Sequence, residues 1–175
     1  SETEKVIREI EKLIDDIRKE SERSIEESRK LLKELEEIVE KAIRDSRRLL
    51  EDLRRLVEDG VDRDEIRKLA EEVERSDREL VKRIEDIARE LKKRDEELLR
   101  ENEKIVRTLE ETIKRELSSE EKADTLRRKL EKLLEDTKRM SEKTKKEIED
   151  LLKRVRELSE ETKRRLDRIL EDVER

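Results

Sequence analysis

The sequence predicts an all-α protein: an up-down-up antiparallel three-helix bundle of long, nearly straight helices, at about 2–58, 63–117 and 120–174, forming a single domain over residues 1–175. Three observations lead to this prediction. Apolar residues recur at steps of three and four along the chain, which is the spacing of one face of an α-helix. Turn signals interrupt this pattern at two places. The chain has no proline and one glycine, Gly60, so few residues could break a helix elsewhere.

The first predicted helix, 2–58, has recognisable signals at both ends. Ser1 and Glu4 have the spacing of a capping box, in which the hydroxyl accepts a hydrogen bond from an unpaired backbone N–H and the carboxylate reaches back. Gly60 can take the left-handed conformation that ends many helices, because it has no Cβ. Val61 follows as the apolar residue that accompanies this kind of helix end.

The second and third predicted helices, 63–117 and 120–174, are separated by a weaker break. Asp62 followed by Glu65 marks the start of the second helix. The serine pair 118–119 marks the start of the third, with neither glycine nor proline beside it. Were this pair helical, the two helices would fuse into one rod, and chains would have to exchange helices to fill their cores. We expect a turn instead.

The numbering of the apolar residues predicts how the helices pack. In an up-down-up bundle, the first and third helices run in the same direction, so the numbers of residues at the same height differ by a constant. The first and second helices run in opposite directions, so the numbers of residues at the same height have a constant sum. The difference is 116 and the sum is 123, so Ile10 lies level with Leu126 and Ile113. A tandem duplication could produce the constant difference but not the constant sum. A folded bundle explains both.

The same two constants place polar residues together in three layers, named here after the residue on the second helix. The Asn102, Asp95 and Asp77 layers are Ser21–Asn102–Thr137, Ser28–Asp95–Thr144 and Ser46–Asp77–Thr162. Four serines lie beside the second and third of these layers: Ser24 and Ser141, and Ser76 and Ser159.

Buried polar groups must find hydrogen-bond partners, and hydroxyls on two helices can donate to an amide or carboxylate on the third. We expect such layers to specify the register of the helices, because a slip would leave polar groups unpaired, whereas an all-leucine core would tolerate it. In the alternative interpretation, Asp77 and Asp95 lie solvated at the edge of the core.

Composition argues against an enzyme and against a cofactor or metal site. The chain has no histidine, cysteine or aromatic residue. Ser28 beside Asp95 therefore lacks the base that a serine nucleophile needs, and no lysine stands at a layer position near these hydroxyls. Carboxylate metal sites in helical bundles normally include Glu-x-x-His pairs, and each polar layer here has at most one carboxylate.

Charge gives no reason to expect a nucleic-acid or membrane partner. The 49 basic and 55 acidic residues nearly balance, so the surface is mixed rather than strongly basic. Apolar residues occur in runs of at most two, whereas a membrane-spanning helix needs about 20. We expect a soluble protein without a targeting signal or transmembrane segment, located in the cytoplasm when it is expressed in cells.

The whole chain resembles de novo designed helical bundles with programmed hydrogen-bond networks. The features that carry the resemblance are capped helices of nearly equal length without proline, a Glu/Lys/Arg/Asp surface, a Leu/Ile/Val core and stacked Ser/Thr/Asn/Asp layers. The resemblance implies no natural substrate and a purpose as a scaffold or as a component of a designed assembly. Spectrin-like repeats share the topology, but their typical core tryptophan is missing.

Two main functions remain open. The first is a structural scaffold, a stable monomeric bundle that needs no partner and has no biochemical activity. The second is a protein–protein interaction module or protomer of a designed assembly, in which apolar residues pair with another helical chain. One flank of three doublets would supply that surface: Leu13/Ile14, Leu31/Leu32 and Leu49/Leu50. A helix-displacement switch is a third possibility, because polar layers lower the cost of opening.

Overall fold

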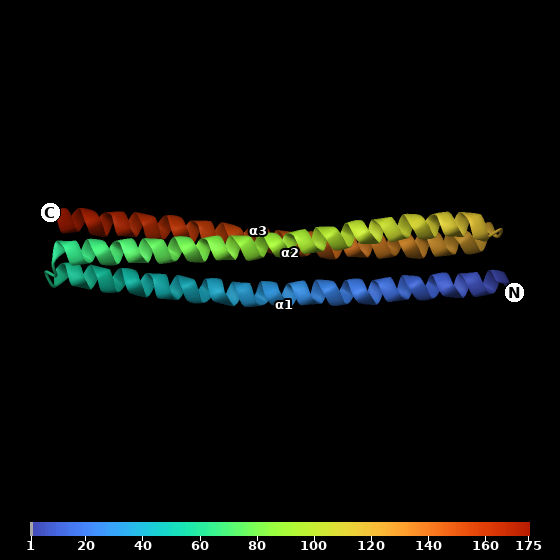
Figure 1. Cartoon of the computed structure of the whole chain (residues 1–175), viewed down its shortest axis with the longest axis horizontal. Helices are drawn as coiled ribbons and strands as arrows, with labels where there is room; N and C mark the ends of the chain where they lie inside the picture. Colours follow the sequence, from blue (N-terminus) through green and yellow to red (C-terminus); the bar gives the residue numbers. More distant parts are fainter. Residues whose placement is uncertain (1) are drawn as a thin grey trace. The chain divides into compact units, whose positions relative to one another are not determined.

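The computed structural model describes residues 2–175 and contains three α-helices: α1 (Glu2–Glu58), α2 (Arg63–Glu116) and α3 (Glu120–Glu174). Figure 1 shows them in sequence colours. The predicted all-α three-helix-bundle fold is confirmed. The predicted helix boundaries differ from the observed ones only at Leu117, which is not helical. Ser1 lies outside the described residues, and with it one half of the predicted Ser1–Glu4 capping box.

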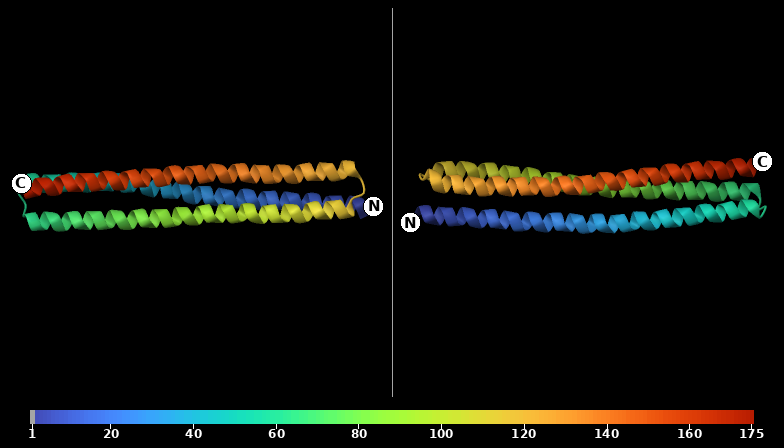
Figure 2. Two further views of the ribbon diagram at one scale, coloured as in Figure 1. Left: turned by 90° about the horizontal axis from the view of Figure 1, so that it is seen from above. Right: turned by 180° about the vertical axis from the view of Figure 1, so that it is seen from behind.

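Each helix contributes one segment to each of two compact units. Unit 1 consists of Ser1–Leu31 and Glu90–Glu147, and unit 2 consists of Leu32–Arg89 and Ile148–Arg175. Unit 1 therefore contains the α2–α3 turn, and unit 2 contains the α1–α2 turn. Within each unit, α1 and α3 run in one direction and α2 runs in the other (Figure 2). The single-domain organisation stays a prediction.

Unit 1 has an aliphatic core built from all three helices. The layer Ile10–Ile113–Leu126, expected from the numbering, is buried on every helix, as is the next layer, Ile14–Leu109–Leu130. Val106 and Leu133 extend the same cluster, with the half-buried Ile17 packed against it. The burial follows from the stripe of apolar residues on each helix, since packing three stripes together removes them from water.

The α2–α3 turn closes the core of unit 1 without a glycine. The N–H of Leu117 still donates to the carbonyl of Ile113 (3.0 Å), and the side chain of Leu117 is buried in the core. The carbonyl of Ser119 accepts the first hydrogen bond of α3 from Ala123 (3.1 Å), so Ser119 is the N-cap residue. Because residues 117–119 are not helical, the alternative in which α2 and α3 fuse into one rod is wrong.

Unit 2 repeats this construction with its own segments of the three helices. Its core cluster includes Leu50, Leu53, Ile66, Ala70, Leu166, Ile169 and Val173. Two further layers expected from the numbering are buried on all three helices: Leu35–Ala88–Leu151 and Val39–Ile84–Val155. Small and large aliphatic side chains therefore alternate at facing positions, which lets the helices interdigitate.

The α1–α2 turn is a Schellman motif. The N–H of Gly60 donates to the carbonyl of Val57 (3.2 Å), and the N–H of Val61 donates to the carbonyl of Leu56 (3.1 Å). Gly60 has a φ of 73°, the left-handed conformation that other residues adopt at a cost. Val61 packs against the core of unit 2, as the apolar residue of this motif does. The glycine at this point in the sequence therefore predicted the turn correctly.

Candidate functional site

The Asn102 layer joins all three helices of unit 1 through one buried side chain. Asn102 Nδ2 donates to Ser21 Oγ on α1 (2.8 Å) and to Thr137 Oγ1 on α3 (3.4 Å). The Thr137 hydroxyl donates in turn to the carbonyl of Leu133 (2.8 Å), so its oxygen is free to accept from the amide. Ser21, Asn102 and Thr137 are all buried. Each of the three side chains thus makes at least one hydrogen bond, and none has a relative exposure above 3%.

The Asp95 layer has the same residue types on α1 and α3 but fewer hydrogen bonds. Ser28 Oγ donates to Asp95 Oδ1 (2.9 Å), while the Thr144 hydroxyl donates to the carbonyl of Met140 in its own helix (3.1 Å). Asp95 Oδ2 is buried and accepts no hydrogen bond from any residue in the described range 2–175. The layer therefore links α1 to α2 and leaves one carboxylate oxygen unpaired.

Asp95 is a buried acid. Its relative exposure is 4%, so the alternative that places it solvated at the core edge is wrong for this residue. Burial raises the pKa of Asp95 above 3.8, because the charged carboxylate loses hydration, while the hydrogen bond from Ser28 and the positive charge of Arg94 oppose this rise. Ionising Asp95 therefore costs more in the folded chain than in the unfolded chain.

The Asp77 layer, in unit 2, is divided into two separate contacts. The hydroxyls of Ser46 and Thr162 lie 3.0 Å apart and are hydrogen-bonded, with either able to donate. Asp77 is only half-buried and accepts a hydrogen bond from Ser159 instead. Burial raises the pKa of Asp77, with a smaller contribution from the charge of Glu74, and the bond from Ser159 opposes both. Asp77 thus lies at the core edge, as the alternative interpretation of that residue stated.

The remaining serines surround these layers without joining them into one network. Ser141 is buried, Ser24 and Ser159 are half-buried, and Ser76 is exposed. Sequence reasoning missed Ile25, which is buried between the Asn102 and Asp95 layers. The constant difference of 116 could have found it, because it places Ile25 level with Ser141. Ile25 on α1 and the buried Ser141 on α3 thus lie at one height between the two layers.

We expect replacement of Ser28 by alanine to lower the free energy of unfolding by about 1–3 kcal/mol, because Asp95 would lose the one hydrogen bond that its carboxylate accepts. Chemical denaturation followed by the helical circular dichroism signal measures this loss. The matched control is Ser76→Ala, at an exposed position, which should change the stability by less than about 0.5 kcal/mol. Equal effects of the two substitutions would contradict the buried hydrogen bond.

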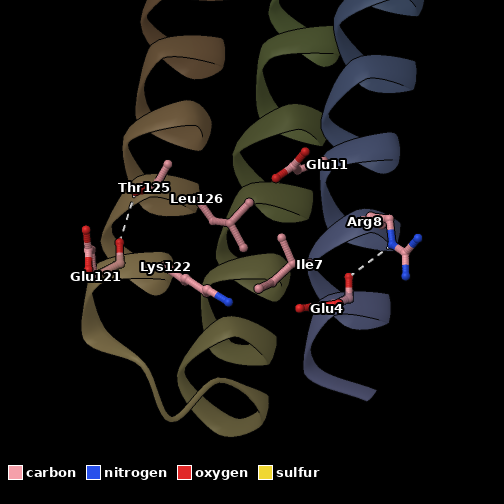
Figure 3. Close-up of a pocket in the computed structure, with 8 residues that line it drawn as sticks. All are labelled: Glu4, Ile7, Arg8, Glu11, Glu121, Lys122, Thr125 and Leu126. Atoms are coloured by element: carbon pink, nitrogen blue, oxygen red, sulfur yellow. Dashed lines mark hydrogen bonds between the residues drawn. The ribbon is translucent and has the colours of Figure 1, made fainter. Parts of the chain in front are cut away.

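Unit 1 has an open groove of about 610 Å³ between α1 and α3. Figure 3 shows Ile7 and Leu126 between the helices, with Lys122 beside them. The drawn hydrogen bonds stay within single helices: Arg8 Nε donates to the carbonyl of Glu4 (3.4 Å), and Thr125 Oγ1 donates to that of Glu121 (3.0 Å). Glu11, which also lines the groove, lies 3.7 Å from Lys129 Nζ on α3, so this carboxylate already has a partner from the protein itself.

Residues 2–175 contain no group of three or more acidic side chains placed to hold a metal ion. None of the three described helices has a stretch that is apolar enough to cross a lipid bilayer.

Comparison with known proteins gives a structural likeness and no sequence family. No protein-family model matches the chain, and no curated protein matches it. A solved structure described as a "Computationally designed three helix bundle" matches with a TM-score of 0.56 and 23% identity, over 98% of this chain and 90% of that one. The chain has a three-helix-bundle fold. At this identity the likeness bears on the fold alone, and the polar layers of the bundle must be interpreted from their own geometry.

Proposed function

We propose that this three-helix bundle is a structural scaffold of the de novo designed type, monomeric and without catalytic activity, in which buried polar layers fix how the helices align. The observation that carries the proposal is the Asn102 side chain, which donates to both other helices of unit 1. The likeness to a designed three-helix bundle supports the proposed origin. A monomer is expected because each unit has a core assembled from all three helices of one chain.

Register specificity follows from the spacing of the layers. The Asn102 and Asp95 layers are seven residues apart, so a slip of α1 by one heptad would move one layer toward the place of the other. Such a slip in one direction would place Leu35 level with Asp95, and in the other direction Ile14 level with Asn102. Either arrangement buries a polar group against an aliphatic side chain, which costs about 1–3 kcal/mol. The correct register avoids this cost.

Burial also argues against catalysis by the most suggestive residue pair. Ser28 donates to Asp95, an arrangement that resembles part of a catalytic site. However, Ser28 is 0% exposed, so a substrate cannot contact its hydroxyl without opening the bundle. A reacting group must lie within hydrogen-bond reach of the atom it attacks or deprotonates. A role in holding α1 against α2 fits this geometry better.

The proposal is tested by making the Asn102 layer apolar, with the triple substitution Ser21→Val, Asn102→Leu and Thr137→Val. Replacing buried polar groups by apolar ones of similar size often keeps or raises stability. We therefore expect an unfolding free energy at least equal to that of the original chain, together with a mixture of oligomers and faster, less uniform amide hydrogen exchange in the core.

The control for this experiment exchanges leucine and isoleucine in the apolar layer Ile14–Leu109–Leu130, seven residues from the Asn102 layer along α1. It changes the core packing without changing any hydrogen bond, so it should give one species with uniform exchange. A triple variant that remains a single, uniformly protected monomer would contradict the role of the Asn102 layer in specificity.

A second candidate function, a protein–protein interaction module, is favoured by the exposure of the apolar doublets. The first residues of the three doublets, Leu13, Leu31 and Leu49, are 47%, 42% and 45% exposed, whereas the second residue of each is buried. Single exposed leucines are common on protein surfaces. The interaction-module function therefore needs several exposed apolar residues that border one groove. Unit 2 has such a groove.

A further inference from the structure

Unit 2 has an open apolar groove of about 310 Å³ between α1 and α2. We call it the α1/α2 groove; its lining residues are Leu49, Asp52, Leu53, Leu56, Leu69, Glu72, Val73 and Ser76. Leu53 belongs to the buried core, whereas Leu49 is strongly exposed. The groove therefore connects the core of unit 2 with solvent through a wall of aliphatic side chains.

Further exposed apolar residues lie on the same lines of the two helices. Ile38 precedes Leu49 by eleven residues, which is close to three helical turns, and Ile87 follows Leu69 by eighteen, which is five turns. Ile38, Leu49 and Ile87 are the large apolar side chains of unit 2 with the highest exposure. All three therefore border one face, and exposed apolar residues gathered in this way typically mark an interaction surface.

The rim of the α1/α2 groove is acidic on both sides. Asp52 on α1 and Glu72 on α2 line it, and Asp52 also lies 3.9 Å from the guanidinium of Arg55 in its own helix. Asp45 lies seven residues before Asp52 on α1, and Glu79 lies seven residues after Glu72 on α2; both are exposed. The residue numbers of each pair, Asp52 with Glu72 and Asp45 with Glu79, add up to 124, so in both pairs one acid lies level with the other. Facing carboxylates repel each other. A cation placed between them would relieve this repulsion.

The other two helix pairs of unit 2 have ion pairs across them. Arg54 pairs with Asp172 between α1 and α3, and Arg67 pairs with Glu174 between α2 and α3 (3.3 Å). Among the described residues of unit 2, no ion pair joins α1 to α2. In unit 1, by contrast, Glu27 on α1 pairs with Arg94 on α2 (2.7 Å). The α1/α2 groove thus differs from the other two helix pairs of unit 2, because the charged side chains that line it on the two helices are both acidic.

We propose that the α1/α2 groove of unit 2 binds an amphipathic helix from another protein whose apolar face is flanked by lysine and arginine. Apolar residues of the partner at positions i, i+3 or i+4, and i+7 would pack on Leu49, Leu56 and Leu69, as in other helix-in-groove complexes. Its basic residues would lie between Asp52 and Glu72. A second copy docked through the same groove would add its own acidic rim, which disfavours self-association. This binding activity goes beyond the proposed scaffold function.

The test uses two fluorescein-labelled amphipathic peptides of about 21 residues, a length of roughly 30 Å as a helix. Both have leucine at the apolar positions; one has lysine and arginine beside the leucine face, and the other has glutamate there. Fluorescence anisotropy with the full chain should show binding of the basic peptide, weakening as salt is added, and no binding of the acidic peptide.

Protein variants locate the binding. Leu49→Gln should weaken binding of the basic peptide at least tenfold, while Leu13→Gln, at an equally exposed position in unit 1, should leave it unchanged. The double variant Asp52→Lys with Glu72→Lys should bind the acidic peptide instead of the basic one. Thermal unfolding of each variant checks that the helices remain folded, as expected for substitutions at exposed positions.

Any of four results would overturn the proposal: no binding of the basic peptide, equal binding of both peptides, equal weakening by Leu49→Gln and Leu13→Gln, or a dimer of the original chain that Leu49→Gln dissociates. The last result would show that a second copy occupies the groove. Failure of peptide binding leaves the proposed scaffold function in place, because that function depends on the polar layers.

Discussion

Replacing Leu130 by alanine is expected to lower the free energy of unfolding by about 2–5 kcal/mol. Leu130 is 0% exposed in the core of unit 1, so its removal leaves a cavity among aliphatic side chains that can only partly relax. Chemical denaturation of the original and substituted chains, followed by the helical circular dichroism signal, gives the difference directly.

Leu13→Ala provides the matched control for this experiment. Leu13 is also a leucine in unit 1, but it is largely exposed, so the same change of side chain should cost well under about 1 kcal/mol. A comparable loss from both substitutions would contradict the observed assignment of the core.

Replacing Asp95 by asparagine is expected to raise the free energy of unfolding at neutral pH by about 1–3 kcal/mol. The substitution removes a buried charge and replaces the unpaired Oδ2 with an amide nitrogen that can donate. By analogy with Asn102, which donates to Thr137, this nitrogen can donate to Thr144. The reverse change, Asn102→Asp, places a carboxylate in the complete layer and should destabilise the chain by a similar amount.

The pH dependence of stability distinguishes an effect of the Asp95 charge from an effect of packing, because a change in packing alone would not alter this dependence. The pKa of Asp95 is raised in the folded chain above its ordinary value of 3.8, and that of Asp77 is raised in the same direction. The folded chain therefore binds these protons more tightly than the unfolded chain does. Their contribution to stability is fully present below pH 3.8 and is lost as the pH rises through the folded-state pKa.

We accordingly expect the stability gap between Asp95→Asn and the original chain to narrow as the pH is lowered from neutral toward 3.8. Protonated Asp95 is neutral and has an O–H that can donate, as the asparagine amide does. Denaturation midpoints of the two chains at several pH values in this range measure the gap. A gap that is constant or that widens toward low pH would contradict the buried, unpaired carboxylate.

The fold was predictable because its signals are local or arithmetical. Gly60 predicted the first turn through its conformational freedom, and the structure has it at a φ of 73°. The constants 116 and 123 gave the height of each residue, and hence buried layers such as Ile10–Ile113–Leu126. The second turn was harder to predict because a buried leucine, Leu117, holds it instead of a glycine.

The hydrogen bonds within the polar layers were less predictable. Height along the bundle does not determine the rotamer of a side chain, and a threonine in a helix can donate to a backbone carbonyl four residues earlier. Thr137 and Thr144 both do so. Thr137 nevertheless accepts from Asn102, which has two protons to donate, whereas Asp95 is a carboxylate and has none when it is ionised. Asp77 pairs with Ser159 rather than with its predicted layer partners.

The outward-facing residues of the doublets show another limit of the sequence pattern. An apolar pair such as Leu49–Leu50 marks the core side of a helix without telling which member is buried. In a three-helix arrangement the buried face of each helix is narrow, so Leu50 is buried and Leu49 is largely exposed. The like charges of Asp52 and Glu72 could have been found from the numbering, but their groove required the structure.

We interpret one chain as a self-contained bundle, with the cores of both units filled by its own three helices. Light scattering on a sizing column tests this most directly, with refractive-index detection because the chain has no aromatic residue. We predict a monomer with a mass of 21.3 kDa at all protein concentrations examined. A stable species of twice that mass would contradict the claim, because helices or apolar faces would then be shared between chains.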